Sequence, residues 1–280
     1  MATIRDVSKE AGLSIATVSR ALSSPERVSK ASLNKVHQAI DKLQYRPNML
    51  SQKFRHKNAN TIVVLVPNIN NLFFSRMIRG IENIAQRRGY SVLVGDTQNS
   101  SQRETEYIHL VETQQADGLI QLATYKEEGA NLPRHHVKAV SAAGCLNTPY
   151  PTVRIDNTSA SKAICDFLTA SGHRRIGVIT GLKDDSNTDE RLDGYKQALA
   201  EVGVAFDSAL VTHGDYSLHS GLLASEHFIA MDERPTALFC MNDEMAIGAI
   251  QAMKAAGMDM ADVQVGGVDA SQDALLAMAA

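Results

Sequence analysis

The sequence predicts an α-helical helix-turn-helix domain followed by an α/β body of two lobes, each built on a doubly wound parallel sheet. Two observations predict this fold class. Over residues 3–22, apolar residues recur at helical spacing on either side of a glycine-containing turn. From residue 61 onwards, short apolar runs alternate with longer amphipathic stretches, which is typical of parallel β-α-β units.

The stretch TIRDVSKEAGLSIATVSRAL, residues 3–22, predicts two short helices joined by a tight turn. The residues expected on their buried faces are Ile4, Val7, Ala11, Val18, Ala21 and Leu22. Gly12 suits the positive φ that ends a helix, and Ser14 can cap the second helix by accepting a hydrogen bond from the amide of Thr17. The residues that would then face a DNA major groove are Ile15, Ala16, Thr17, Ser19 and Arg20.

An ordinary helical hairpin in a protein core would show the same apolar pattern, so charge is needed to distinguish the two interpretations. Residues 1–60 contain eleven Lys and Arg against four Asp and Glu, a balance of +7, whereas the whole chain carries −3. A small basic module joined to an acidic body favours nucleic-acid binding, because Lys and Arg displace counterions from phosphates. Since one such head makes few base contacts, we expect a dimer on palindromic DNA.

A third helix is expected after Ser29, which can cap it. Its buried face would consist of Val36, Ala39, Ile40 and Leu43. A short hinge helix would follow Pro47, although so short a helix is marginal alone. We therefore expect a head at residues 1–46, a hinge helix with linker at 47–60, and a body at 61–280. The body would consist of a first lobe at about 61–155 and a second lobe at about 156–280.

The body shows two series of strands and helices. In the first lobe, strands are expected at 61–66, 90–96, 117–123 and 137–143, and helices at about 73–89 and 102–115. In the second lobe, strands are expected at 174–181, 208–214, 236–241 and 263–269, and helices at about 157–171, 189–202, 217–231 and 243–256. This alternation predicts two doubly wound sheets.

A ligand cleft is expected between the lobes, because parallel sheets place ligand-contacting loops at the carboxyl ends of their strands. The residues in such positions are Phe73, Phe74, Arg191, Tyr216, Asn242, Asp243 and Asp269. Aromatic faces can stack on a base or ring, and Arg and Asp can form charge-assisted hydrogen bonds with hydroxyls or ring nitrogens. The set suits a sugar or a nucleoside, although loop or core packing is an equal alternative for any single residue.

The N-terminal stretch resembles LacI-type bacterial repressors, whose first helices read close to T-I-x-D-V-A-x-x-A-G-V-S-x-x-T-V-S-R-x-L, and the similarity runs from residue 2 to about residue 269. The resemblance implies a cytoplasmic transcription repressor that binds double-stranded operator DNA as a homodimer. It also implies a body like that of periplasmic binding proteins, with a small-molecule effector in its cleft. The residues then expected to contact DNA are Thr3, Ser14, Ile15, Ala16, Thr17, Ser19, Arg20, Arg27, Lys53, Phe54 and Arg55.

In that family, the segment matching residues 48–54 is a hinge helix that orders only on operator DNA and wedges a leucine into the minor groove. Phe54 stands in that place, and the flanking Lys53 and Arg55 would reach phosphates on either side. The alternative for Phe54 is a packing role beneath the head or in a dimer contact.

Three stretches are most similar to family members that respond to a nucleoside: ALSSPERVS, VVLVPNINNLFFSRMIRGIE and GYSVLVGDTQNSSQRE. The resemblance therefore implies a nucleoside effector, with cytidine as the first candidate. Family members continue beyond the point where this chain stops, at DASQDALLAMAA. We accordingly expect a shortened form whose body lacks the final strands of both lobes.

Catalysis has little support in the sequence. A dinucleotide enzyme would carry G-x-G-x-x-G, a hydrolase G-x-S-x-G and a phosphate-binding ATPase G-x-x-x-x-G-K, and none of these occurs. We expect no catalytic residues and no cofactor, and the adjacent His135 and His136 favour a solvated loop over a metal site. No apolar run approaches the roughly 20 residues of a membrane span, and the N-terminus lacks a signal pattern. A secreted solute-binding protein of the same fold is therefore the weaker alternative.

Overall fold

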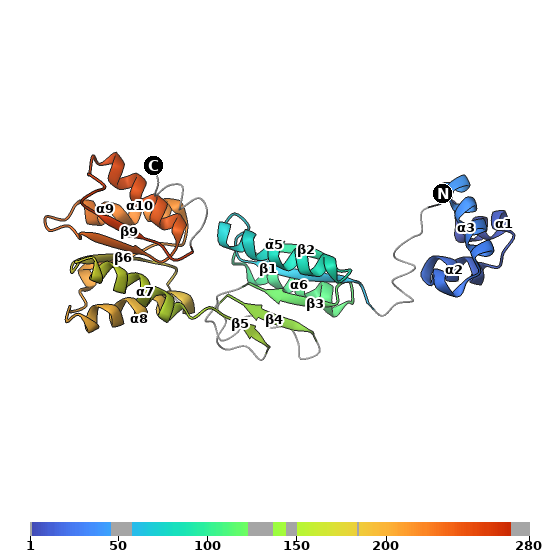
Figure 1. The fold of residues 1–280 in the computed structure, drawn as a ribbon, viewed down its shortest axis with the longest axis horizontal. Coiled ribbons are helices and arrows are strands. Elements are labelled where there is room, and N and C mark those ends of the chain that lie inside the picture. The colour runs from blue at the N-terminus through green and yellow to red at the C-terminus, as the bar shows by residue number, and fades with distance from the viewer. Residues whose placement is uncertain (1, 46–57, 123–136, 144–149, 184, 270–280) are drawn as a thin grey trace. The chain divides into compact units, whose positions relative to one another are not determined.

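The computed structural model describes residues 2–45, 58–122, 137–143, 150–183 and 185–269. The chain divides into two compact units, Met1–Ala59 and Asn60–Ala280, and each has its own hydrophobic core. The second unit contains two parallel sheets, one in each lobe. This architecture confirms the predicted combination of a helix-turn-helix domain with a two-lobed α/β body (Figure 1).

The N-terminal unit contains α1 (Ile4–Ala11), α2 (Ile15–Ser23) and α3 (Lys30–Leu43). The 3₁₀ turn η1 (Pro25–Arg27) lies between α2 and α3. It begins with a proline, which has no amide hydrogen to leave unpaired at the first position of a turn. Each of these α-helices contributes a fully buried side chain to the core, namely Val7, Val18 and Val36.

The predicted ends of these helices are confirmed. Gly12 has a φ of 64°, the left-handed conformation that ends α1. The Ser14 hydroxyl oxygen accepts a hydrogen bond from the Thr17 amide at 3.1 Å and so caps α2. Ser29 caps α3 in the same way, by accepting from the Ser32 amide at 3.3 Å. Local side-chain chemistry therefore sets where the second and third helices begin.

The first lobe contains β1 (Thr61–Val66), β2 (Ser91–Asp96), β3 (Gly118–Gln121), β4 (Ala139–Ala142), β5 (Thr152–Val153), α5 (Leu72–Arg87) and α6 (Ser101–Glu112). The strands are parallel and follow the order β2-β1-β3-β4-β5. In β1, Val63 and Leu65 pack with residues of α6. Val64 and Val66 pack on the other face with Phe74 of α5. Burial on both faces explains why TIVVLV is apolar throughout rather than alternating.

A carboxyl group is buried in this lobe. The Glu104 side chain on α6 is 3% exposed and accepts a hydrogen bond from Nε2 of Gln121 in β3. Burial raises the pKa of Glu104 above its ordinary value of 4.5, because the charged form loses its hydration. The folded lobe therefore binds this proton more tightly than the unfolded chain does. Its stability falls as the pH rises from 4.5 through the higher pKa of the folded state.

Glu104→Gln is expected to raise the free energy of unfolding at about pH 7, because the amide can keep a hydrogen bond to Gln121 without burying a charge. The difference from wild type should shrink as the pH falls toward about 4, where the wild-type carboxyl is protonated in both states. Urea unfolding across this pH range measures the effect. Glu106→Gln, an exposed change on the same helix, is the control. A difference that stays constant with pH would contradict this account of Glu104.

The second lobe contains β6 (Ile176–Thr180), β7 (Val211–His213), β8 (Ala237–Cys240) and β9 (Gln264–Gly266), which are parallel in the order β7-β6-β8-β9. Its helices are α7 (Asn157–Ala170), α8 (Ser186–Glu201), α9 (Leu218–Ile229) and α10 (Asp243–Ala255), and the turn η2 (Ser208–Leu210) precedes β7. The pair α7 and α8 covers one side of the sheet and the pair α9 and α10 the other (Figure 1). At the centre of this core, the buried rings of Tyr195 and Phe239 stack with centroids 6.3 Å apart.

Helix α8 begins at Ser186, three residues before the predicted start at residue 189. Asp185 caps this earlier start, because its carboxylate accepts a hydrogen bond from the Asn187 amide at 2.9 Å. Ser186 and Thr188 are polar yet buried, so the first turn lacks the apolar periodicity that marks a helix in a sequence. The sequence pattern therefore placed the start too late.

Candidate functional site

The outward face of α2 carries the side chains that the sequence predicts to contact DNA. Ile15 is 43% exposed, and Ala16 and Arg20 are exposed as well. Thr17 and Ser19 are half-buried, and the opposite face of the helix packs into the core of the head. The exposed face thus begins with apolar side chains, which suit thymine methyl groups, and continues to a guanidinium, which suits guanine.

Three other predicted DNA contacts lie at helix ends or in a turn. Thr3 caps α1, where its hydroxyl and its backbone amide donate to the Asp6 carboxylate at 2.7 and 2.8 Å. These hydrogen bonds, first that of the side chain and then that of the backbone, hold the pKa of Asp6 below its ordinary value. Ser14 caps α2, and Arg27 is exposed at the end of η1 with Nε 3.6 Å from the Glu26 carboxylate.

Some predicted residues lie outside the described part of the chain. They are the hinge-helix residues Lys53, Phe54 and Arg55 and the histidines His135 and His136. Among the described residues, no group of three or more His, Cys, Asp and Glu side chains is arranged to hold a metal ion. Of the helices that the structure describes, none is both long enough and apolar enough to cross a membrane.

A cavity of about 250 Å³ lies in the body, lined by residues of both lobes. Six of the predicted effector residues line it: Phe73, Phe74, Arg191, Tyr216, Asn242 and Asp269. Asp243 instead lines an adjacent cavity of about 260 Å³. The polar lining residues that the sequence did not predict are Asn68, Asn71, Asn99, Asp185, Asn187, Asp215 and Ser217. Asn68 and Asn71 closely follow β1, so the strand-end rule could have found them.

Arg191 is held in one orientation by its neighbours, and only 7% of it is exposed. Its Nε donates a hydrogen bond to Oδ1 of Asn157 at 2.9 Å, and Nη1 donates to the carbonyl oxygen of Met241. Its guanidinium carbon lies 6.0 Å from the centroid of the Tyr216 ring. A guanidinium carries more N–H donors than these two contacts use, so the fixed side chain can still donate to a ligand.

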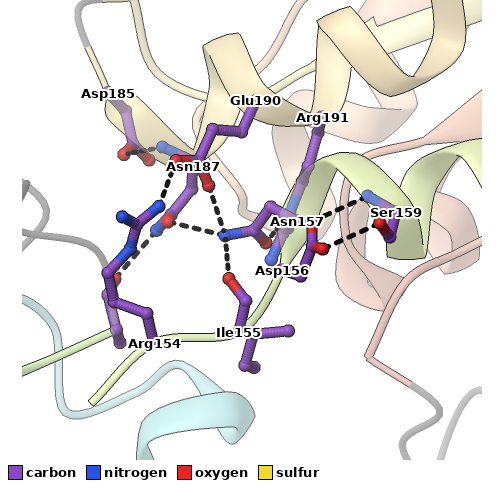
Figure 2. Close-up of polar contacts among 10 residues, drawn as sticks. Arg154, Ile155, Asp156, Asn157, Ser159, Asp185, Asn187, Glu190 and Arg191 are labelled. Carbon is purple, nitrogen blue, oxygen red and sulfur yellow. Dashed lines mark hydrogen bonds and ion pairs between the residues drawn. The ribbon is translucent and has the colours of Figure 1, made fainter. Parts of the chain in front are cut away.

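The same arginine is hydrogen-bonded to Asn157 at the end of the interlobe segment, residues 154–157, which joins β5 of the first lobe to α7 of the second (Figure 2). Asn157, the first residue of α7, donates to Oδ1 of Asn187 at 3.0 Å and to Oε2 of Glu190 at 3.3 Å. Glu190 forms an ion pair with Arg154. Asn187 in turn donates to the carbonyl oxygen of Ala143, in the first lobe, at 2.9 Å. Hydrogen bonds therefore run from the cavity to the interlobe segment and on to the first lobe.

Tyr216 lines the cavity in a backbone conformation that L-residues rarely adopt, with a φ of 70°. Its hydroxyl donates to Oδ2 of Asp185 at 2.8 Å and lies 2.7 Å from the hydroxyl oxygen of Thr188. Burial raises the pKa of Tyr216, and it also raises that of Asp185. Gly181 makes room for the ring, since a Cβ there would lie 2.0 Å from Cζ of Tyr216. A side chain at this position would therefore displace the Tyr216 ring.

Asn242 and Asp269 combine a structural contact with a position on the cavity. Asn242 caps α10 by accepting from the Met245 amide at 3.0 Å, and its Nδ2 donates to the carbonyl oxygen of Tyr216 at 2.8 Å. The Asp269 amide donates to Oδ1 of Asp243 at 3.1 Å. Burial raises the pKa of Asp269. Asp243 thus supports Asp269, a residue of the cavity of about 250 Å³, without lining that cavity itself.

Comparisons with known proteins show which families the two units of the chain match. Residues 3–48 match the family described as bacterial regulatory proteins, lacI family, and residues 59–278 match periplasmic binding proteins and sugar binding domain of LacI family. The chain is 38% identical to the HTH-type transcriptional repressor CytR of Escherichia coli (strain K12), over 96% of this chain and 80% of that relative. It is 33% identical to catabolite control protein A of Priestia megaterium, over 95% of this chain and 82% of that relative.

Two solved structures are similar to this chain over different lengths. The lac repressor dimer bound to operator and the anti-inducer ONPF is similar with a TM-score of 0.87 at 26% identity, over 97% of this chain and 83% of that one. The Caulobacter myo-inositol binding protein bound to myo-inositol is similar with a TM-score of 0.70 at 30% identity, over 78% of each chain. The first similarity is broad enough to include both head and body.

Proposed function

The chain belongs to the LacI family of bacterial regulatory proteins, and we propose that a nucleoside, with cytidine as the first candidate, is the effector that controls it. The protein is a DNA-binding transcription repressor that acts as a homodimer with a small-molecule effector. Its relatives CytR and catabolite control protein A are transcription regulators and not enzymes. We place this repressor in the cytoplasm.

Each part of the chain has one role. Residues 1–46 bind the major groove of DNA, residues 47–60 connect this head to the body, and residues 61–280 bind the effector. The DNA contacts predicted for the head, and for Lys53, Phe54 and Arg55 in the connecting segment, remain part of this proposal.

The observation that supports a nucleoside is the chemistry of the cavity in the body. Phe73 and Phe74, whose rings pack edge to face with centroids 5.5 Å apart, offer apolar surfaces to a planar base. Arg191, Asp185 and Asp269 offer charged groups that can bind ribose hydroxyls and the polar edge of a base. A ligand that combines a flat ring with several hydroxyls matches both features.

Calorimetry with cytidine, adenosine and ribose tests the class of effector. We expect cytidine to bind most tightly and to change the affinity of the repressor for operator DNA in a gel-shift assay. Ribose binding as tightly as cytidine would contradict the proposal, because the base would then contribute nothing.

Arg20→Ala is expected to weaken operator binding by about 1–3 kcal/mol and to relax specificity at one base pair. The exposed guanidinium of Arg20 on α2 can donate two hydrogen bonds to guanine, and alanine can donate none. Fluorescence anisotropy with a set of operators, each changed at one base pair, measures both effects. A uniform loss across all of these operators would instead make Arg20 a phosphate contact.

A further inference from the structure

Asp185 is part of the cavity wall and is almost completely buried, at 3% exposed. It stands directly before α8, and Figure 2 shows it beside Asn187. Its Oδ1 accepts a hydrogen bond from the Asn187 amide at 2.9 Å. Its Oδ2 accepts one from the Tyr216 hydroxyl at 2.8 Å. Both carboxylate oxygens are therefore fixed in position on the wall.

The direction of these hydrogen bonds makes Asp185 an acceptor. Burial raises the pKa of the Tyr216 phenol, which therefore keeps its proton and donates it to Asp185. The Thr188 hydroxyl, 2.7 Å away, is then left to donate to the phenol oxygen. A carboxylate has about four lone-pair sites, and the chain uses two of them here, so about two remain for a ligand.

Opposing influences act on the ionisation of Asp185. Burial, the largest of them, raises its pKa, whereas the positive charge of Arg191 lowers it and so favours the ionised form. The negative charge of Asp189, one turn along α8, raises this pKa as the smallest contribution. Nε and Nη1 of Arg191 donate to Asn157 and Met241 rather than to this carboxylate. The free acceptor sites of Asp185 are thus presented beside a fixed guanidinium, in a cavity that also contains aromatic rings.

We propose that Asp185 determines effector specificity by selecting rings that present an amino group to it over rings that present a carbonyl oxygen. This assignment rests on the proposed nucleoside effector, for which it favours cytosine over uracil. An amino group facing the carboxylate forms an N–H···O hydrogen bond, whereas a carbonyl oxygen in that place leaves two acceptors without a donor. We expect cytidine to bind about 10- to 100-fold more tightly than uridine.

Asp185→Asn tests the assignment by calorimetry on the full chain. The amide keeps one oxygen that can cap α8, and its nitrogen supplies donors that match the carbonyl oxygen of uracil. The variant should bind uridine more tightly than cytidine, which reverses the order of the wild type. Asp207→Asn is the matched control, since Asp207 caps η2 by accepting from the Ala209 amide at 2.9 Å and does not line the cavity. It should keep the wild-type order.

A second measurement does not depend on the folding of a variant. A pyrimidine nucleoside with hydrogen in place of the amino group should bind the wild type more weakly than cytidine and more tightly than uridine. Three results would each overturn the role of Asp185 and leave a nucleoside effector standing: equal wild-type affinities for cytidine and uridine, an unchanged order in Asp185→Asn, or loss of both ligands by an Asp185→Asn variant with a normal melting temperature. A wild type that binds operator DNA but no nucleoside would overturn the effector as well.

Discussion

Arg191→Ala is expected to lower the affinity for the effector by a factor of about 100 or more. Hydrogen bonds from a charged group contribute about 1.5–3 kcal/mol each, so the loss of one or two accounts for this factor. Asn157 and Met241 already fix the guanidinium in place, so it binds a ligand without first losing conformational freedom. Arg191→Lys should restore little of the loss, because an ammonium group cannot reproduce the planar fork.

Calorimetry measures this loss, and operator binding by the same preparation reports whether the head is intact. Arg174→Ala is the matched control, because Nη1 of Arg174 also donates to a carbonyl oxygen, that of Thr169 at 2.7 Å, yet Arg174 does not line the cavity. This control should keep the wild-type effector affinity. An Arg191→Ala variant that binds the effector as tightly as wild type would show that the ligand does not contact this side chain.

The elements that local chemistry controls were predictable from the sequence. Gly12 and Ser14 act within a few residues of themselves, so their pattern alone predicted the turn of the head. The apolar run of β1 likewise predicted a strand of a parallel sheet, and the structure buries this strand on both faces. Six of the candidate cavity residues follow the same logic, because parallel strands bring their carboxyl ends to one edge.

The remaining features of the cavity depend on contacts between distant segments. Asp185 follows the end of β6 as Asn71 follows the end of β1, so the strand-end rule could have named it as a lining residue. Its hydrogen bond with Tyr216, which is 31 residues away in the chain, could not be predicted. The link from Asn187 to Ala143 spans 44 residues and joins the two lobes. No spacing rule within one helix or strand carries such information, so these contacts follow only from the folded chain.

The close approach of α7 and α8 at Gly194 is a third contact between segments that are distant in the chain. A Cβ on Gly194 would lie 2.3 Å from the carbonyl oxygen of Thr158 and 2.9 Å from the amide nitrogen of Lys162. Both are backbone atoms that cannot rotate away, so Gly194→Ala must push the two helices apart. We expect the variant to lose about 3 kcal/mol of unfolding free energy, the upper end of the usual range for an overpacked core.

Gly80→Ala in α5 is the matched control, and it should change the unfolding free energy in the opposite direction. Gly80 is exposed and a Cβ there would meet nothing within 4 Å, so alanine should raise the unfolding free energy by about 1 kcal/mol through its higher helix propensity. Urea unfolding followed by circular dichroism measures both variants. Separation of the helices also affects the cavity, because Asn157 at the start of α7 orients Arg191 on α8. Gly194→Ala should therefore weaken effector binding together with stability, and a less stable variant with unchanged effector affinity would show that this helix contact does not position Arg191.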